Sequence, residues 1–232
     1  MKWHYLERGE IDATAWDRRV DATAGVPYVR VGYLDAVSPG WCGLVADDYR
    51  AVMPVPVRRC GPVRRSLPPL YAQQLGVCAD GPLAPELWGR LFALLRRRVP
   101  FADDYPFNTD NLTLRAPASV RVRPGLTQRL DLAPPYEALR RAYARDQRAN
   151  LNRAARGGLR AYAGEDIEPL WQMFATHVAG RLYAPPAAAG ETLARLWSHL
   201  KGNGSGEVRY VAAPDGELLA GALFVRHRQQ II

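Results

Sequence analysis

The chain has 232 residues, 48% hydrophobic and 23% charged, which is the composition of a globular protein with an ordinary core. Its net charge of +8 permits a polyanionic partner. Its only lysines are Lys2 and Lys201, and this preference for arginine also fits a GC-rich coding sequence. No apolar run of about 18 residues and no apolar leader core occur, so the sequence predicts neither a transmembrane helix nor a signal peptide. Cys42, Cys60 and Cys78 lack CxxC spacing and predict reduced thiols in a cytoplasmic protein.

Residues 1–132 predict a first domain of mixed helices and strands. Period-two alternation of apolar residues marks the strands, and spacing of three to four residues marks the helices. Asp12 is the expected N-cap of the first helix, since its carboxylate can accept from free backbone N–H groups. In chain order we expect a strand at 2–6, helices at 12–24 and 29–37, strands at 41–46, 49–58 and 70–77, a helix from 82, and strands at 101–107 and within 120–132.

Residues 133–158 form a basic run that predicts a connecting helix, beginning after a double proline and ending at a double glycine. Arg141, Arg145 and Arg148 lie at i, i+4 and i+7, and Asn152 continues the same face. Such a row can hold phosphate or carboxylate groups through charge-assisted hydrogen bonds. The alternative is a solvated helix face whose apolar side packs between the two domains.

Residues 159–232 repeat the order of elements with little residue identity, which indicates an internal duplication. We expect a strand at 159–163, helices at 167–178 and 191–200, a hairpin of strands at 207–213 and 218–227, and the start of a fourth strand at 229–232. The turn of the hairpin is Pro-Asp-Gly-Glu at 214–217. Because an apolar strand start at Ile232 would leave an unpaired sheet edge, we expect the natural chain to continue and the second domain to be incomplete.

Four segments carry a resemblance to Fem-type transferases, which are tandem GNAT-like proteins. They are YLDAVSPGW at 33–41, AVMPVPVRR at 51–59, YAQQLGV at 71–77, and the strand, double proline and basic helix of 127–159. The resemblance implies an α+β fold of two GNAT-like domains, each a mostly antiparallel sheet flanked by helices. It also implies transfer of an acyl or aminoacyl group, from acetyl-CoA or an aminoacyl-tRNA, to an amine acceptor in the bacterial cytoplasm. A small molecule or a cell-wall precursor would be the acceptor, and tRNA is a candidate partner.

The acyl-donor loop is the element that the sequence lacks. GNAT domains hold the CoA pyrophosphate on backbone N–H groups before a helix, where glycines allow close approach. Residues 76–88, GVCADGPLAPELW, do not have the R/Q-x-x-G-x-G/A pattern, and the corresponding loop of the second half would lie beyond Ile232. No catalytic residue is therefore assigned. The alternative function is a non-catalytic binding module with a degenerate GNAT-like cleft. A nucleic-acid binder is a third, which rests only on the net charge and the arginine-rich helix.

Candidate binding residues of the first half lie in YAQQLG and in FNTDNL. Alternation in the predicted strand places Gln73 with Tyr71 on one face and Gln74 on the other. A buried amide must find partners, so one glutamine faces a cleft or is satisfied by neighbouring backbone. Asn108 and Asn111 follow the next predicted strand, where they line the same cleft or make local turns.

The remaining candidates depend on the resemblance. Tyr183 lies between two predicted helices, in a loop that covers the acceptor substrate in GNAT folds. Arg145, Arg148 and Asn152 correspond to a region that borders the central cleft of Fem-type proteins. The four histidines lack HxxxH or Cys/His spacing, so the sequence predicts no metal site.

Overall fold

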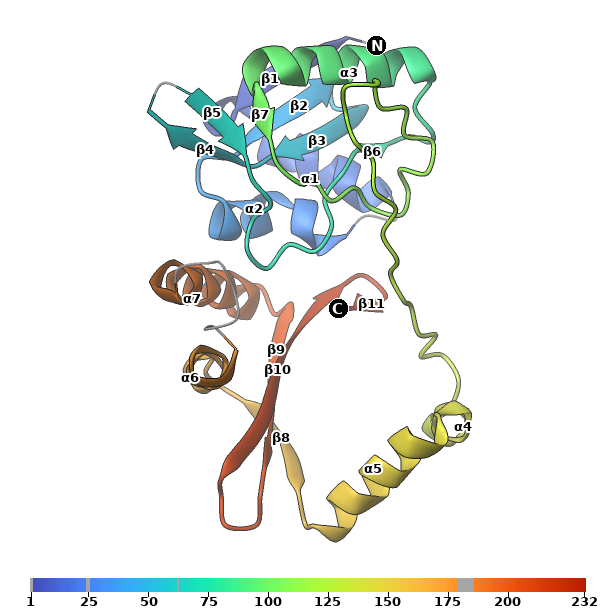
Figure 1. Cartoon of the computed structure of the whole chain (residues 1–232), viewed down its shortest axis with the longest axis vertical. Coiled ribbons are helices and arrows are strands. Elements are labelled where there is room, and N and C mark those ends of the chain that lie inside the picture. The colour runs from blue at the N-terminus through green and yellow to red at the C-terminus, as the bar shows by residue number, and fades with distance from the viewer. Residues whose placement is uncertain (1, 24–25, 62, 179–185) are drawn as a thin grey trace.

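The computed structural model describes residues 2–23, 26–61, 63–178 and 186–232, and it is a mixed α+β protein, as the sequence predicts (Figure 1). The described strands form two four-stranded sheets and one three-stranded sheet. One four-stranded sheet belongs to the N-terminal half of the chain and the other to the C-terminal half.

The N-terminal half is built on an antiparallel sheet with the strand order β1-β2-β3-β6. A small sheet, β4-β5-β7, extends from it and contains one parallel pair, β5 with β7. The elements of this half are β1 (Trp3–Glu7), η1 (Arg8–Glu10), α1 (Ala13–Ala22), η2 (Pro27–Val29), α2 (Val31–Val37), β2 (Cys42–Ala46), β3 (Ala51–Val55), β4 (Val57–Cys60), β5 (Val63–Ser66), β6 (Cys78–Ala79), α3 (Pro85–Arg98) and β7 (Phe101–Ala102).

Both faces of the first sheet are covered, which explains why β2 and β3 are apolar throughout and fully buried. Val45 and Val52 belong to the core on the side of α1 and α2. Leu44 and Met53 belong to a second core, which Trp88 of α3 completes on the opposite face. The half is therefore a three-layer arrangement of helix, sheet and helix.

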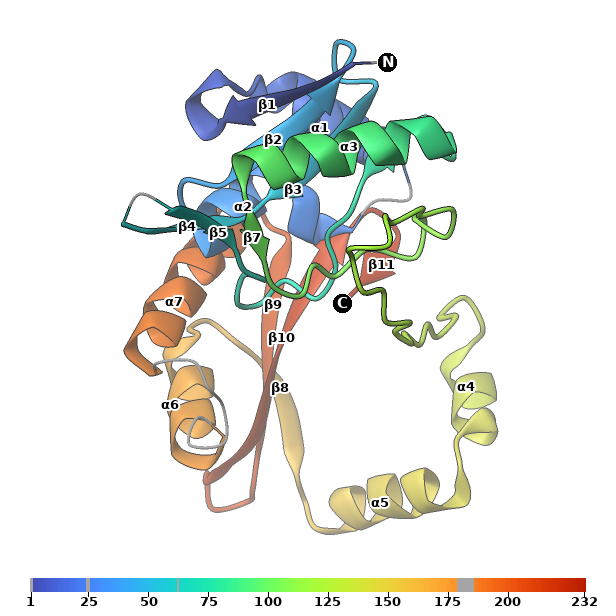
Figure 2. The ribbon, with the colours of Figure 1, turned by 45° about the horizontal axis from the view of Figure 1, so that its top comes forward.

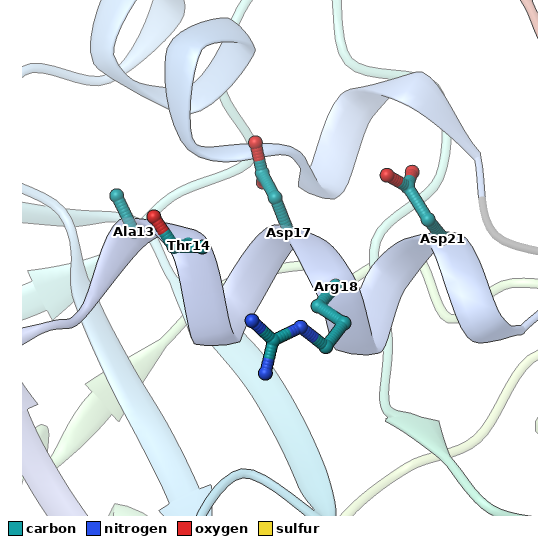
Figure 3. Close-up of a pocket in the computed structure, with 5 residues that line it drawn as sticks. All are labelled: Ala13, Thr14, Asp17, Arg18 and Asp21. Carbon is teal, nitrogen blue, oxygen red and sulfur yellow. The ribbon is translucent and has the colours of Figure 1, made fainter.

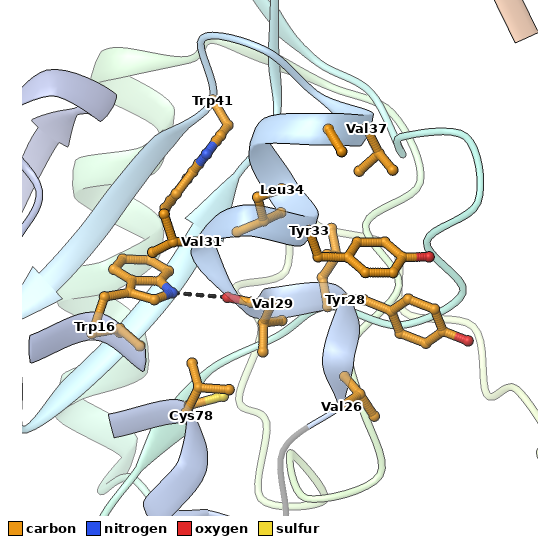
Figure 4. Packing of buried hydrophobic residues seen from close by; sticks show 14 of the residues in the cluster. Trp16, Val26, Tyr28, Val29, Val31, Tyr33, Leu34, Val37, Trp41 and Cys78 are labelled. Atoms are coloured by element: carbon orange, nitrogen blue, oxygen red, sulfur yellow. Dashed lines mark hydrogen bonds between the residues drawn. The ribbon is translucent and has the colours of Figure 1, made fainter. Parts of the chain in front are cut away.

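The first helix starts and packs as its sequence predicts. Asp12 caps α1, because its carboxylate accepts the backbone N–H of Thr14 at 2.9 Å. Trp16 is fully buried, and its indole N–H donates to the carbonyl of Val29 at 2.8 Å (Figure 4). The ring of Trp16 meets that of Trp41 edge to face, with centroids 4.9 Å apart. These contacts fix η2, and hence the start of α2, against α1.

The C-terminal half repeats the plan of the first: a strand, two helices and then antiparallel strands. Its sheet has the order β8-β9-β10-β11, which matches β1-β2-β3-β6 strand for strand. The predicted hairpin and the start of a fourth strand are confirmed here. The elements are β8 (Arg160–Gly164), α6 (Glu168–His177), α7 (Pro186–Gly202), β9 (Gly206–Ala212), β10 (Leu218–His227) and β11 (Gln230–Ile231). The domain boundaries at 132 and 158 stay a prediction.

The two halves meet where α2 packs on α7, with the end of β10 beside them; we call this contact the junction (Figure 2). Each of these helices is the second helix of its own repeat. Leu196 and Leu200 of α7 and Val225 of β10 are buried in the core of the first half. Arg195 donates to the carbonyl of Ala36 in the last turn of α2, at 3.1 Å. The halves therefore share one hydrophobic core.

Three predicted strands are wrong or too long. Residues 70–77 form turns and extended chain, with a single bridge from Leu75 to Phe107, and of 101–107 only β7 is a strand. Residues 120–132 contain no strand, and Leu126, Leu130 and Leu132 are all more than half exposed. Alternation marks a segment as amphipathic, but a strand also needs an edge that accepts its hydrogen bonds, and no described strand pairs with this segment.

The basic connecting run forms two helices, α4 (Tyr136–Ala142) and α5 (Arg145–Arg156), which we call the basic arm. None of its residues is buried, and Leu151 on α5 is 42% exposed. In both views the arm extends away from the N-terminal half (Figures 1 and 2). The expectation that its apolar side packs between the domains is therefore wrong.

Candidate functional site

The segment YAQQ at 71–74 lies at the junction and is held from both halves. Tyr71 has a φ of 65°, a left-handed conformation that an L-residue adopts only when its surroundings enforce it. Its carbonyl accepts the hydroxyl of Tyr33 on α2 at 2.5 Å. Its own hydroxyl donates to the carbonyl of Ala189 on α7 at 3.1 Å. Tyr71 therefore connects the two repeats through its backbone and its side chain.

The two glutamines of this segment differ in their surroundings. Gln73 is exposed, whereas the Oε1 atom of Gln74 is buried and accepts no hydrogen bond from any described residue. A buried carbonyl oxygen without a donor typically costs about 1–3 kcal/mol, and native structures keep few such groups. Of the two, Gln74 is the better ligand candidate, because an N–H donor would remove this cost; its Oε1 exposes less than 1 Å², so a ligand reaches it only if the segment moves.

Asn108 and Asn111 pack against Gly76 and Val77, just after the YAQQ segment. Asn111 clamps Val77, accepting its N–H at 2.8 Å and donating to its carbonyl at 2.9 Å. Asn108 is 6% exposed, and its Oδ1 accepts the N–H of Asp110 at 2.9 Å. Gly76, at a φ of 108°, packs directly on both asparagines, so a side chain there would collide with them. Asn108 therefore makes a local turn, one of the two interpretations of the sequence, whereas Asn111 makes a long-range contact that neither interpretation gave.

The candidates on the basic arm lie apart from the YAQQ segment. Arg145, Arg148 and Asn152 are exposed on α5, and Asn152 accepts a hydrogen bond from Arg140 at 2.7 Å. Figures 1 and 2 both place α5 far from the N-terminal half that carries residues 71–74. The structure therefore does not bring these two groups of predicted residues into one site. Tyr183 lies outside the described residues.

A polar cluster at the junction has no counterpart in the sequence predictions. Arg30 binds two carboxylates of α1, Asp17 at 3.1 Å and Asp21 at 2.5 Å. Asp17 also accepts the N–H of Val31 at 2.9 Å, which positions the first turn of α2. Figure 3 shows both carboxylates on one side of α1, where they border a surface hollow of about 510 Å³. The only sequence signal was the i, i+4 spacing of Asp17 and Asp21, and such spacing usually marks a solvated helix face.

Two histidines of the C-terminal half face this cluster. Burial lowers the pKa of His199, and so does the positive charge of Arg30, while Asp17 and Asp35 oppose them. Burial also lowers the pKa of His227, against the charge of Asp21. His227 is 7% exposed and its Nε2 has no partner among the described residues. Both imidazoles therefore have a lowered pKa beside charged groups of the other half.

Two backbone N–H groups of the segment 76–88, where the resemblance would place a CoA pyrophosphate, already have partners within the chain. The N–H of Gly76 is donated to the hydroxyl of Tyr105 at 3.2 Å, and that of Val77 to Asn111. A pyrophosphate needs such N–H groups free, and here the fold has used them. Among the described residues, no group of three His, Cys, Asp or Glu side chains could hold a metal ion.

None of the helices within the described ranges is long and apolar enough to span a bilayer. No protein-family model matches the chain, and no curated protein matches it significantly. The resemblance of its four segments to Fem-type transferases therefore stays a prediction from the sequence.

Proposed function

We propose that the chain acts in N-acyl transfer of the Fem/GNAT type, moving an acyl or aminoacyl group from CoA or an aminoacyl-tRNA onto an amine. The four sequence segments and the repeated plan of the two halves support this class. The observation that carries it is Gln74, whose buried Oε1 lacks a donor beside a segment tied to both halves. A primary amine is the acceptor chemistry that supplies such a donor.

The role proposed for Gln74 is to hold and orient the acceptor. A neutral amine donates one N–H to Oε1 and keeps its lone pair free to attack the donor carbonyl. The new C–N bond forms, the bond from the carbonyl carbon to its leaving group breaks, and the nitrogen loses one proton. Because the N–H groups of Gly76 and Val77 already have partners within the chain, no step is assigned to CoA, and the residue that takes the proton is not assigned.

Acyl transfer from labelled acetyl-CoA or labelled aminoacyl-tRNA to a panel of primary amines tests this proposal. Losing one hydrogen bond of about 0.5–1.5 kcal/mol predicts that Gln74→Leu raises the KM for the amine roughly 2- to 10-fold. Gln73→Leu is the matched control, and it should leave KM unchanged because Gln73 is exposed. Removing an unpartnered oxygen should not lower the melting temperature of Gln74→Leu, so a kinetic loss cannot be ascribed to unfolding.

A non-catalytic binding module is the second candidate, favoured by the backbone N–H groups already used at Gly76 and Val77. It predicts that amines bind and raise the melting temperature, that Gln74→Leu weakens binding, and that neither donor yields a product. Equal behaviour of the Gln73 and Gln74 variants would contradict both candidates.

A further inference from the structure

We infer that the basic arm is a docking surface for the phosphate backbone of a nucleic acid duplex. The inference does not depend on the acyl-transfer proposal, because the arm is separate from the YAQQ segment. It begins with an imbalance of charge: residues 136–160 contain seven arginines but only two acidic residues, Glu137 and Asp146. A surface of this charge attracts polyanions.

The arginines of α5 gather on one side of the helix. At 100° per residue, Arg145, Arg148, Arg153 and Arg156 fall within about 140° of arc, with Asn152 between them. The twelve residues from Arg145 to Arg156 span eleven steps and rise about 16 Å along the helix axis. Arginine forks and an asparagine amide spaced over this length can reach several phosphates of one backbone.

Unlike several arginines of the N-terminal half, the arginines of α5 have no carboxylate partner among the described residues. In that half Arg8 binds Asp35, and Arg65 binds Asp103. Within the described part of the chain, the side chains of Arg145 and Arg148 form no ion pair or hydrogen bond, although the backbone N–H of Arg148 donates to Ala144. Arg153 contacts only the amide oxygen of Asn150, at 3.2 Å. The charge of the arm is thus available to an external anion.

A nucleic acid fits the arm better than an anionic membrane does. A helix that lies in a membrane interface needs a broad face of leucine or aromatic residues opposite its charges. On α5 the side opposite the arginines offers Leu151 with Gln147 and Ala154. One leucine gives little apolar area to insert, whereas the cationic face needs only phosphates.

The test is the salt dependence of binding to fluorescein-labelled 20-bp duplexes. Separate titrations with RNA and with DNA show which of the two backbones the arm binds. Four neutralised phosphates predict a slope of about −3.6 in log affinity against log salt on duplex DNA. This corresponds to roughly a 150-fold loss between about 50 and about 200 mM salt. Arg145→Gln/Arg148→Gln should reduce the slope by about 1.8, and helicity should persist because glutamine is a good helix former.

The matched control is Arg115→Gln/Arg121→Gln, which removes the same charge from exposed chain outside the arm. It should change the slope much less than the α5 pair does. An equal loss in both variants would show diffuse attraction and overturn the inference. So would absence of duplex binding, or binding to phosphatidylserine vesicles in its place. Because the acyl-transfer assay reports on Gln74, failure of either proposal is recognised separately.

Discussion

Leu196→Ala tests whether the two halves are one cooperative unit. Leu196 lies on α7 in the C-terminal half, yet it is 1% exposed within the core of the N-terminal half. The substitution removes three carbon atoms, worth roughly 2.4 kcal/mol at about 0.8 kcal/mol each. A cavity adds to this loss, so we expect about 3–4 kcal/mol off the free energy of unfolding.

Urea titration followed by tryptophan fluorescence and by circular dichroism measures the effect. The wild-type chain should unfold in one transition by both probes, because the halves share a core. In the variant we expect a lower midpoint and separate transitions for the two probes. Ser198→Ala, exposed on the same helix, should stay within about 0.5 kcal/mol of wild type. A loss below about 1 kcal/mol for Leu196→Ala would refute the shared core.

Two further predictions concern titrating groups. The free energy of unfolding should fall as the pH drops below 6.5. Burial lowers the pKa of His199 and His227 in the folded chain, so the unfolded chain takes up protons first and is stabilised. Urea midpoints should trace this decline, His227→Gln should flatten it, and a wild-type profile that is level in this range would contradict the cause. Burial also raises the pKa of Cys42 and Cys78 to about 11. In a Cys60→Ser variant, which leaves only these two thiols, both should react with a thiol reagent only as fast as the folded chain opens. A rapid stoichiometric reaction at neutral pH would show that these thiols are accessible.

Local patterns predicted the parts of the fold that depend on neighbouring residues. Asp12 caps α1 as expected, since a cap needs only a carboxylate next to the first free N–H groups. The Pro-Asp-Gly-Glu turn correctly joined β9 to β10. Residues 120–132 show the limit of such patterns. Their alternation is real, but pairing partners decide whether a strand forms, and alternation carries no information about partners.

The candidate site was half visible in the sequence. The adjacent glutamines of YAQQ marked an unusual segment, but the predicted strand gave them alternate faces, whereas the structure puts the segment in a turn anchored by Tyr33 and Ala189. The cluster of Asp17, Arg30 and His199 left only the i, i+4 spacing of Asp17 and Asp21, which does not point to Arg30 or His199. Its members are up to 182 residues apart in the chain, so only the packing of α2 on α7 brings them together.

Four features followed from the sequence: the α+β class, most helices, the hairpin of the second half and the repeated order of elements. Each of them depends on interactions within a few residues. The packing of α2 on α7, the buried Oε1 of Gln74 without a donor and the exposure of the basic arm could be seen only in the tertiary structure. These features depend on which distant surfaces exclude water from one another. Hydrophobic burial is non-directional, so periodicity identifies the face that will be buried but not the surface that buries it.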